Sequence, residues 1–221
     1  ADVPDVVPAY LSAQMPLSSV FDLPGYTRDS CVGAAAVARL TADGSITREQ
    51  EIDQLGIRPL WSVLLTGYEL MTAEPSTQPL GQRGAILRSP GGAVDRAVET
   101  MGAAGVSMPL GDMYEAVSRG TVDGTVASPT SMAPYKLAEV LRNSTIGADL
   151  GSVAVLYSIS EQQWSELNDE QRSIVDEVAA ATQKNLCEQL NELLPKSQTQ
   201  MEEDGTTLNR LTPEQQAQWD E

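Results

Sequence analysis

Residues 84–126, GAILRSPGGAVDRAVETMGAAGVSMPLGDMYEAVSRGTVDGTV, decide the fold class of this chain. A short apolar run at 85–87 precedes Val94, Val98 and Met101, which recur at the three- to four-residue spacing of one helix face. The alternation continues with a strand, a helix and a second strand expected at 106–109, 111–119 and 122–126. Strands that alternate with helices predict an α/β fold with largely parallel sheets.

Upstream, residues 59–71 (PLWSVLLTGYELM) form the longest strand signal of the chain. The run is too long for one ordinary strand of about 5–6 residues, and Gly67 interrupts it. We therefore predict a strand that leaves one domain and continues into the next, with Gly67 near the crossover.

The last third of the chain changes to a helical pattern. Two capping-box patterns follow each other, one beginning at Ser160 and one at Asn168. From Asp169 the apolar residues keep helical spacing as far as Pro195, and helix-like sequence resumes to Asp204. Because a helix beyond about 25 residues is unusual within one compact domain, we expect a strut that lies across two domains.

The remaining elements are predicted from local patterns. Prolines between residues 15 and 26 rule out a helix there and indicate a packed loop. Strands are expected at 6–11 and 153–157, and helices at 30–40, 48–55, 135–141 and from 212 onward.

Composition excludes several classes of function. The 221 residues carry a formal net charge of −17, which repels phosphate backbones and anionic lipid heads, so we expect no nucleic-acid partner. The chain has no histidine, the commonest general base and metal ligand, and it shows none of the common catalytic or nucleotide-binding motifs. No apolar run reaches the 18–20 residues or so of a membrane span, and the sequence starts without a signal-peptide pattern. We predict a binding protein without catalytic residues, metal or cofactor, and keep an α/β enzyme that uses acidic residues as the alternative.

The two cysteines, Cys31 and Cys187, lie far apart in the sequence. They could form a disulfide if the chain resides outside the cytoplasm. They could equally be two small buried hydrophobic residues.

Several short motifs, in order along nearly the whole chain, resemble those of one family. They are GAILRSP at 84–90, MGA at 101–103, VSMPLGDMYEA at 106–116 and GTVDG at 120–124, with PLSSVFDLP at 16–24, KLAEV at 136–140 and WSEL at 164–167. Together they resemble the DctP-type extracytoplasmic solute receptors of TRAP transporters.

The resemblance implies a two-lobed α/β fold, like type II periplasmic binding proteins, with a long hinge-spanning helix and a cleft that closes over one small ligand. Lobe 1 would comprise 1–66 and 152–192, lobe 2 would comprise 67–151, and 193–221 would return across lobe 2. Family members begin with a strand–helix–strand unit that does not match here, so we expect an N-terminally incomplete receptor, either a fragment or a protein completed by another chain.

The resemblance also implies a function. The protein would be a receptor in the periplasm or at the cell surface that binds a small organic acid and delivers it to TRAP membrane subunits, without inserting into the membrane itself. A two-lobed sensory or ABC-type receptor is the other binding class to consider.

Arg88 is the main candidate ligand residue. It ends an apolar strand, and ligands of open α/β sheets sit beyond the carboxyl ends of strands. Its planar guanidinium matches a carboxylate in two parallel hydrogen bonds, and the resemblance makes it the family's carboxylate clamp. Glu69 aligns where many acid-binding members carry a second arginine, which favours a hydroxy- or amino-substituted acid over a simple diacid. The alternative for Glu69 is an outward carboxylate on an edge strand.

Other candidates carry weaker signals. Thr125 and Ser128 follow Asp123-Gly124, where the family often places a polar contact, although a turn role fits them equally well. Aromatic residues are candidate pocket walls, with ordinary core packing as the alternative for each: Tyr10, Phe21, Trp61, Tyr68 and Tyr157.

Overall fold

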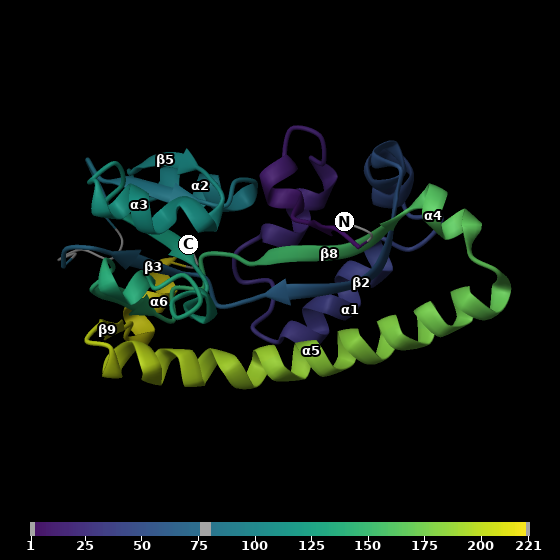
Figure 1. Ribbon diagram of the computed structural model, residues 1–221. Helices are drawn as coiled ribbons and strands as arrows, with labels where there is room; N and C mark the ends of the chain where they lie inside the picture. Colours follow the sequence, from purple (N-terminus) through teal and green to yellow (C-terminus); the bar gives the residue numbers. More distant parts are fainter. Residues whose placement is uncertain (1–2, 76–80, 220–221) are drawn as a thin grey trace.

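The computed structural model describes residues 3–75 and 81–219 as two β-sheets spanned by one long helix (Figure 1). The strands are β1 (Asp5–Val6), β2 (Ile57–Leu65), β3 (Glu69–Thr72), β4 (Ile86–Ser89), β5 (Ala104–Ser107), β6 (Gly124–Ala127), β7 (Asn143–Ile146), β8 (Val153–Ser160) and β9 (Thr207–Arg210). We call the three-stranded sheet (order β1-β8-β2) with its helices lobe 1, and the six-stranded sheet (order β5-β4-β6-β3-β7-β9) with its helices lobe 2.

Helices and tight turns cover both sheets. The α-helices are α1 (Ser30–Leu40), α2 (Ala93–Thr100), α3 (Met113–Ser118), α4 (Glu161–Glu166), α5 (Asp169–Glu203) and α6 (Pro213–Trp219). The short helical turns are η1 (Pro8–Leu11), η2 (Leu17–Asp22), η3 (Arg48–Ile52), η4 (Asp53–Leu55), η5 (Leu110–Asp112), η6 (Pro129–Ser131) and η7 (Leu137–Glu139).

The chain passes from lobe 1 to lobe 2 between β2 and β3. The overlong 59–71 signal becomes β2 in lobe 1 and β3 in lobe 2, and Gly67 between them adopts a φ of 65° that favours glycine. The return crossing, from β7 to β8, runs beside the first. Tyr68 N donates to Gly151 O at 3.4 Å, and Leu150 N donates to Tyr68 O at 2.8 Å. Two antiparallel segments therefore form the connection between the lobes.

The expectation of largely parallel sheets was wrong. Both strand pairs of the lobe 1 sheet are antiparallel. In lobe 2, β4 runs parallel to β5 and β6, and β7 parallel to β9, whereas β3 is antiparallel to both of its neighbours. The crossing strands explain the difference, because a chain that leaves a lobe and later returns beside itself must run antiparallel to its outgoing strand.

Three local predictions also need correction. Residues 6–11 form only the end of the two-residue β1 and then η1, because Pro8 cannot donate to a sheet ladder. Residues 17–22, expected as loop, form the 3₁₀ turn η2, which begins after Pro16. Residues 135–141 form turns around η7 and no regular α-helix, and Lys136 at the start of η7 has a left-handed φ of 54°.

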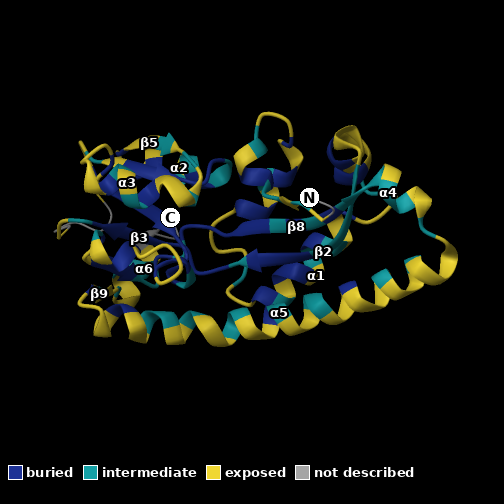
Figure 2. Cartoon of the chain, viewed as in Figure 1, coloured by how far each residue is buried: buried dark blue, intermediate teal, exposed yellow. Residues whose placement is uncertain are grey.

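Helix α5 runs along both lobes as one 35-residue element (Figure 1). It begins with the predicted capping box, in which Asn168 and Gln171 exchange side-chain and backbone hydrogen bonds. Pro195 lies inside the helix and does not end it. Most of the outward face of α5 is exposed (Figure 2), while Met201 near its end is buried in the core of lobe 2. Strand β9 then adds to the lobe 2 sheet beside β7.

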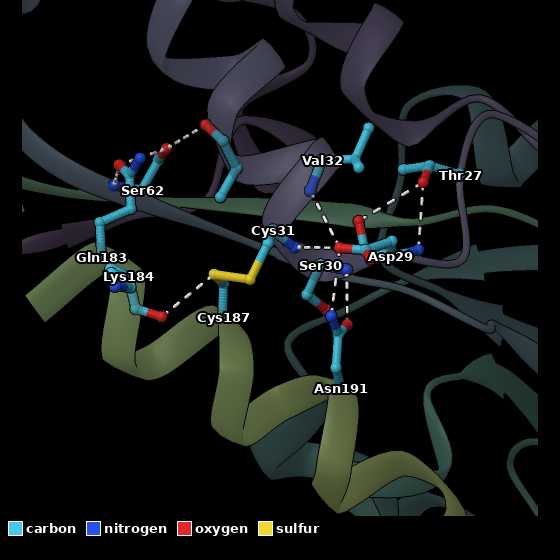
Figure 3. The surroundings of a disulfide bond; sticks show 11 residues. Thr27, Asp29, Ser30, Cys31, Val32, Ser62, Gln183, Lys184, Cys187 and Asn191 are labelled. Atoms are coloured by element: carbon cyan, nitrogen blue, oxygen red, sulfur yellow. Dashed lines mark hydrogen bonds between the residues drawn. A yellow bond between two sulfur atoms is a disulfide. The ribbon is translucent and has the colours of Figure 1, made fainter.

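A disulfide between Cys31 and Cys187 fastens α5 to α1, with a Cα–Cα distance of 4.8 Å (Figure 3). Of the two alternatives for these cysteines, a disulfide or two separate buried side chains, the structure has the disulfide. One helical turn further along α5, Asn191 accepts from Ser30 N at 2.7 Å and donates to Asp29 at 3.1 Å. Asp29 in turn caps α1 by accepting from Cys31 N and Val32 N. The middle of α5 is thus held to lobe 1.

Across residues 3–75 and 81–219, none of the helices combines the length and the apolar character that crossing a bilayer requires.

Candidate functional site

Arg88 lies inside the junction between the lobes, at the carboxyl end of the interior strand β4. It is paired with Val106 of β5 on one side and Thr125 of β6 on the other. Arg88 is 1% exposed and forms no ion pair with the residues that the structure describes, which is a rare combination for an arginine. Nε donates to Met108 O at 2.8 Å, and Nη2 donates to Tyr10 Oη at 3.3 Å. The guanidinium is therefore oriented by the protein and does not point into bulk water.

Tyr10 connects the two lobes at this point. It lies in η1 of lobe 1, and its hydroxyl accepts from Arg88 Nη2 and from Leu110 N, each at 3.3 Å, in lobe 2. The side chain is still 41% exposed. Tyr10 thus makes a contact across the junction while part of its surface stays accessible to solvent.

Tyr68, between the crossing strands, is surrounded by charged and polar groups from both lobes. Burial raises the pKa of Tyr68 well above its ordinary value. The positive charge of Arg88 partly opposes this rise in pKa, and Tyr10, Asp22 and Tyr135 add to it. Lobe 1 supplies Tyr10 and Asp22 to this group, and lobe 2 supplies Arg88 and Tyr135.

Glu69 is a buried carboxylate on an interior strand, so the alternative of an outward residue on an edge strand was wrong. It is 3% exposed, and β3 is flanked by β6 and β7. Oε1 accepts from Gly147 N at 2.8 Å, while Oε2 accepts from Thr145 Oγ1 at 2.9 Å and Ala148 N at 3.0 Å. Burial raises the pKa of Glu69 to about 7, and these three hydrogen bonds limit the rise. The contacts hold the segment after β7; a ligand contact of Glu69 stays a prediction.

The other three predicted ligand residues, Thr125, Ser128 and Phe21, are all buried, but they lie in different surroundings. Thr125 is fully buried beside Arg88 in the β4–β6 register. Ser128 is buried too and accepts from Thr130 Oγ1 at 3.0 Å. Phe21 packs in the core of lobe 1 with Leu64 and its neighbours. Their roles in binding stay predictions, and Thr125 is the one that adjoins Arg88.

The remaining two aromatic candidates lie within lobe 1. Trp61 and Tyr157 face each other across β2 and β8, with ring centroids 4.9 Å apart and an interplanar angle of 12°. This arrangement is a stacked cross-strand pair that stabilises the sheet.

A pocket of about 210 Å³ lies beside α1, β2 and α5, on a part of lobe 1 that excludes Arg88. Its charged lining is already paired: Arg48 contacts Asp53 and Glu161 at 2.5 Å each, and Arg58 lies 3.5 Å from Glu161. These ion pairs account for the two arginines that line the pocket. Within the described ranges, no cluster of three acidic or cysteine side chains could hold a metal ion.

Asp22 belongs to the junction, although the sequence patterns did not single it out. It ends η2, is 0% exposed, and has no hydrogen-bond partner on either carboxylate oxygen among the described residues. Burial raises the pKa of Asp22 to about 8. The one sequence signal was its place in the FDLP segment, at 21–24, which we interpreted as part of a family motif and not as a functional group.

Comparisons with known proteins agree with this architecture. The family model of bacterial extracellular solute-binding protein, family 7, matches residues 5–221. The C4-dicarboxylate-binding periplasmic protein DctP of Rhodobacter capsulatus is 28% identical over 161 residues, which cover 70% of this chain and 47% of that protein. The chain thus spans about half the length of that curated relative.

Solved structures show the same fold. A marine metagenome TRAP solute-binding protein specific for aromatic acids, in complex with metahydroxyphenylacetate, matches with a TM-score of 0.87 at 21% identity, covering 100% of this chain and 69% of that one. A TRAP periplasmic solute-binding protein of Pseudomonas aeruginosa with bound L-malate matches with a TM-score of 0.86 at 17% identity, covering 99% and 76%.

Proposed function

The chain belongs to family 7 of the bacterial extracellular solute-binding proteins, and from this we propose that it is an extracytoplasmic receptor for a small organic acid, delivered to the membrane subunits of a TRAP transporter. Proteins of this family and its structural neighbours bind solutes and are periplasmic or extracellular. The disulfide between Cys31 and Cys187 suits such a compartment. The observation that carries the proposal is the buried, oriented guanidinium of Arg88 at the lobe junction.

Arg88 supports carboxylate binding through its burial and its incomplete pairing. Its two contacts in the described part of the chain are to neutral oxygens, of Met108 and Tyr10, so its charge has no carboxylate partner there. A buried guanidinium is costly to leave without an anion. A ligand carboxylate in the cleft would supply that anion through bidentate hydrogen bonds.

The groups around Arg88 favour a hydroxy- or amino-substituted acid over a simple diacid. The resemblance places Glu69 where many acid-binding members carry a second arginine, and on that reading a second ligand carboxylate would meet no cation there. Tyr10, Tyr68 and Tyr135 provide hydroxyl groups and aromatic faces instead. The neighbours bind related chemistry, namely an aromatic hydroxy acid and L-malate.

The lobes that close on the ligand would meet at the two crossings, with boundaries near 66/67 and 151/152. The part of α5 up to residue 192 would belong to lobe 1, to which Cys187 and Asn191 attach it. Residues 193–221 would belong to lobe 2, whose sheet includes β9. The ligand would favour the closed arrangement because it contacts both lobes at once.

Calorimetry tests the proposal, with a thermal-shift screen to choose the ligand from a panel of L-malate, malonate, mandelate, 3-hydroxybenzoate and pyroglutamate. Arg88→Gln should raise Kd by at least about a hundredfold, because breaking a buried charge pair costs about 3–5 kcal/mol. Arg88→Lys keeps the charge but loses the fork and provides a second measurement if Gln impairs folding. Arg96→Gln, an exposed arginine of the same lobe, should leave Kd unchanged.

Two results would contradict the receptor hypothesis. One is that no acid of the panel shifts the unfolding temperature; the other is that folded Arg88 variants bind within tenfold of the native protein. Following the bound acid by NMR for chemical turnover separates a receptor from an acid-using enzyme, since a receptor returns its ligand unchanged.

A further inference from the structure

The backbones of the two lobes touch at a pair of glycines just beyond Arg88. A Cβ atom on Gly91 would lie 2.5 Å from Ala9 O, and a Cβ on Gly92 would lie 2.5 Å from Asp22 Oδ2. Both distances are shorter than any normal contact. Each glycine also has a positive φ, 103° for Gly91 and 61° for Gly92. The approach of lobe 2 to lobe 1 therefore depends on the absence of side chains at these two positions.

Asp22 lies at the centre of this contact. Gly151, in the return crossing, also approaches it, since a Cβ there would lie 2.8 Å from Asp22 O. Gly92 is the N-cap residue of α2 and has no side chain of its own to cap the helix. Asp22 Oδ2, from the other lobe, lies where the Cβ of a side chain at position 92 would be.

The chemistry of this position is unusual because the Asp22 side chain is buried among groups that do not pair with its carboxylate. Both carboxylate oxygens are buried and unpartnered within the described chain. Burying an ionised carboxylate without a partner is strongly unfavourable, whereas burying the neutral acid costs much less. If the lobes separate, water reaches the carboxyl group and the charged form becomes acceptable again.

We infer that Asp22 and Gly92 form the contact that seats the two lobes against each other, and that this contact closes with the Asp22 carboxyl protonated. The inference deepens the proposed function and rests on it, because it concerns how the same receptor is regulated. Closure would take up one proton, and ligand affinity would follow closure.

The direction of the pH effect follows from the two environments. In the closed arrangement burial raises the pKa of Asp22 to about 8, compared with an ordinary value of 3.8 in water. Burial of Asp22 therefore does not oppose closure below pH 3.8, where the carboxyl is protonated in both arrangements. As the pH rises from 3.8 to about 8, the open arrangement becomes increasingly favoured. Between them, the ratio of closed to open protein should fall by up to about tenfold per pH unit.

Other titratable groups near the contact do not produce the same effect. Tyr68 has Asp22, Arg88, Tyr10 and Tyr135 in its surroundings, and burial moves the pKa of Tyr68 further upward, out of the neutral range. In the first turn of α2, Asp95 is bonded to Ser89 Oγ within lobe 2. Asp149 lies in the return crossing and pairs with Arg28 at 3.1 Å.

Lobe separation can be measured without any ligand by pulsed electron paramagnetic resonance, with one spin label at Ala35 in α1 and one at Arg119 after α3, both exposed. The native protein should shift from closed toward open between pH 5 and pH 9. Asp22→Asn, which cannot ionise, should give the same distance distribution at both pH values. Glu99→Gln removes an exposed carboxyl of α2 in the same lobe and should leave the pH-dependent shift unchanged.

A steric test uses matched glycines. Gly92→Ala should hold the protein open at both pH values, and Asp22→Ala in that background should restore closure by removing the opposing side chain. Gly120→Ala is the control, because Gly120 has a similar φ of 66° but no atom within 4 Å of the position that a Cβ would take.

A native protein with one distance distribution at pH 5 and pH 9 would overturn the inference, as would an Asp22→Asn variant that keeps the pH-dependent shift. If Asp22→Asn does not fold, carbon NMR of the native carboxyl decides, and a pKa near 4 for Asp22 refutes the idea. If the protein binds an organic acid but its lobe separation does not depend on pH, the inference is refuted and the receptor proposal stands. If lobe separation depends on pH but no organic acid of the panel binds, the receptor proposal is refuted and the lobe contact stands.

Discussion

Removing the disulfide between Cys31 and Cys187 should cost this protein a large part of its stability. The bond closes a loop across 156 residues of sequence, and the chain-entropy model gives about 5 kcal/mol for a loop of that length, with typical measured values of about 2–4 kcal/mol. The nearby bonds of Asn191 to Ser30 and Asp29 would remain, so α5 should stay beside α1 in the folded state (Figure 3). We therefore expect a loss of about 2–5 kcal/mol, expressed mainly through the unfolded state.

Equilibrium urea unfolding of Cys31→Ala, Cys187→Ala and the double variant measures this loss. Because either single change already opens the loop, the double variant should be no less stable than the single ones, apart from small packing differences. Reduction of the native protein should reproduce the double variant. Two results would refute the loop-closure reasoning: a loss of stability below about 1 kcal/mol on reduction, or a double variant whose loss equals the sum of the losses in the two single variants.

Three further changes test other parts of the structure by urea unfolding. The folded pKa of Glu69, about 7, lies above its ordinary value of 4.5. The contribution of this carboxyl to the free energy of unfolding is therefore complete below pH 4.5 and declines up to pH 7, so the unfolding free energy of the native protein should fall by about 3 kcal/mol relative to that of Glu69→Gln over this interval. A difference that does not change with pH would argue against the shifted pKa. Gly33→Ala should destabilise the protein by about 1–3 kcal/mol, because its Cβ would lie 2.9 Å from Leu64 Cβ, whereas Gly111→Ala, with no atom within 4 Å, is the control that should change little. Asn168→Ala should cost about 1 kcal/mol through loss of the α5 capping box, and an unchanged unfolding midpoint would show that tertiary contacts alone hold that helix end.

Features that depend on neighbours in the sequence were predictable. The helix from Asp169 onward, its capping box and the strand at Arg88, which the structure extends to Ser89, follow from spacing and local backbone preference. The turn around Lys136 was missed because its helix-like spacing was overruled by a left-handed residue, which no spacing pattern reveals.

The sequence by itself determined the α/β class, the acidic surface, the long helix and the family-like motifs, because these reside in composition and in periodicity over a few residues. Only the tertiary structure decided that Cys31 meets Cys187, that Glu69 is enclosed by backbone donors, and that the Asp22 carboxylate lies against Gly92 with no hydrogen-bond partner among the described residues. Each of these depends on segments distant in the chain being packed together, and the free energy of a buried charge or a close glycine contact is set by those distant neighbours and not by the residues beside it in the sequence.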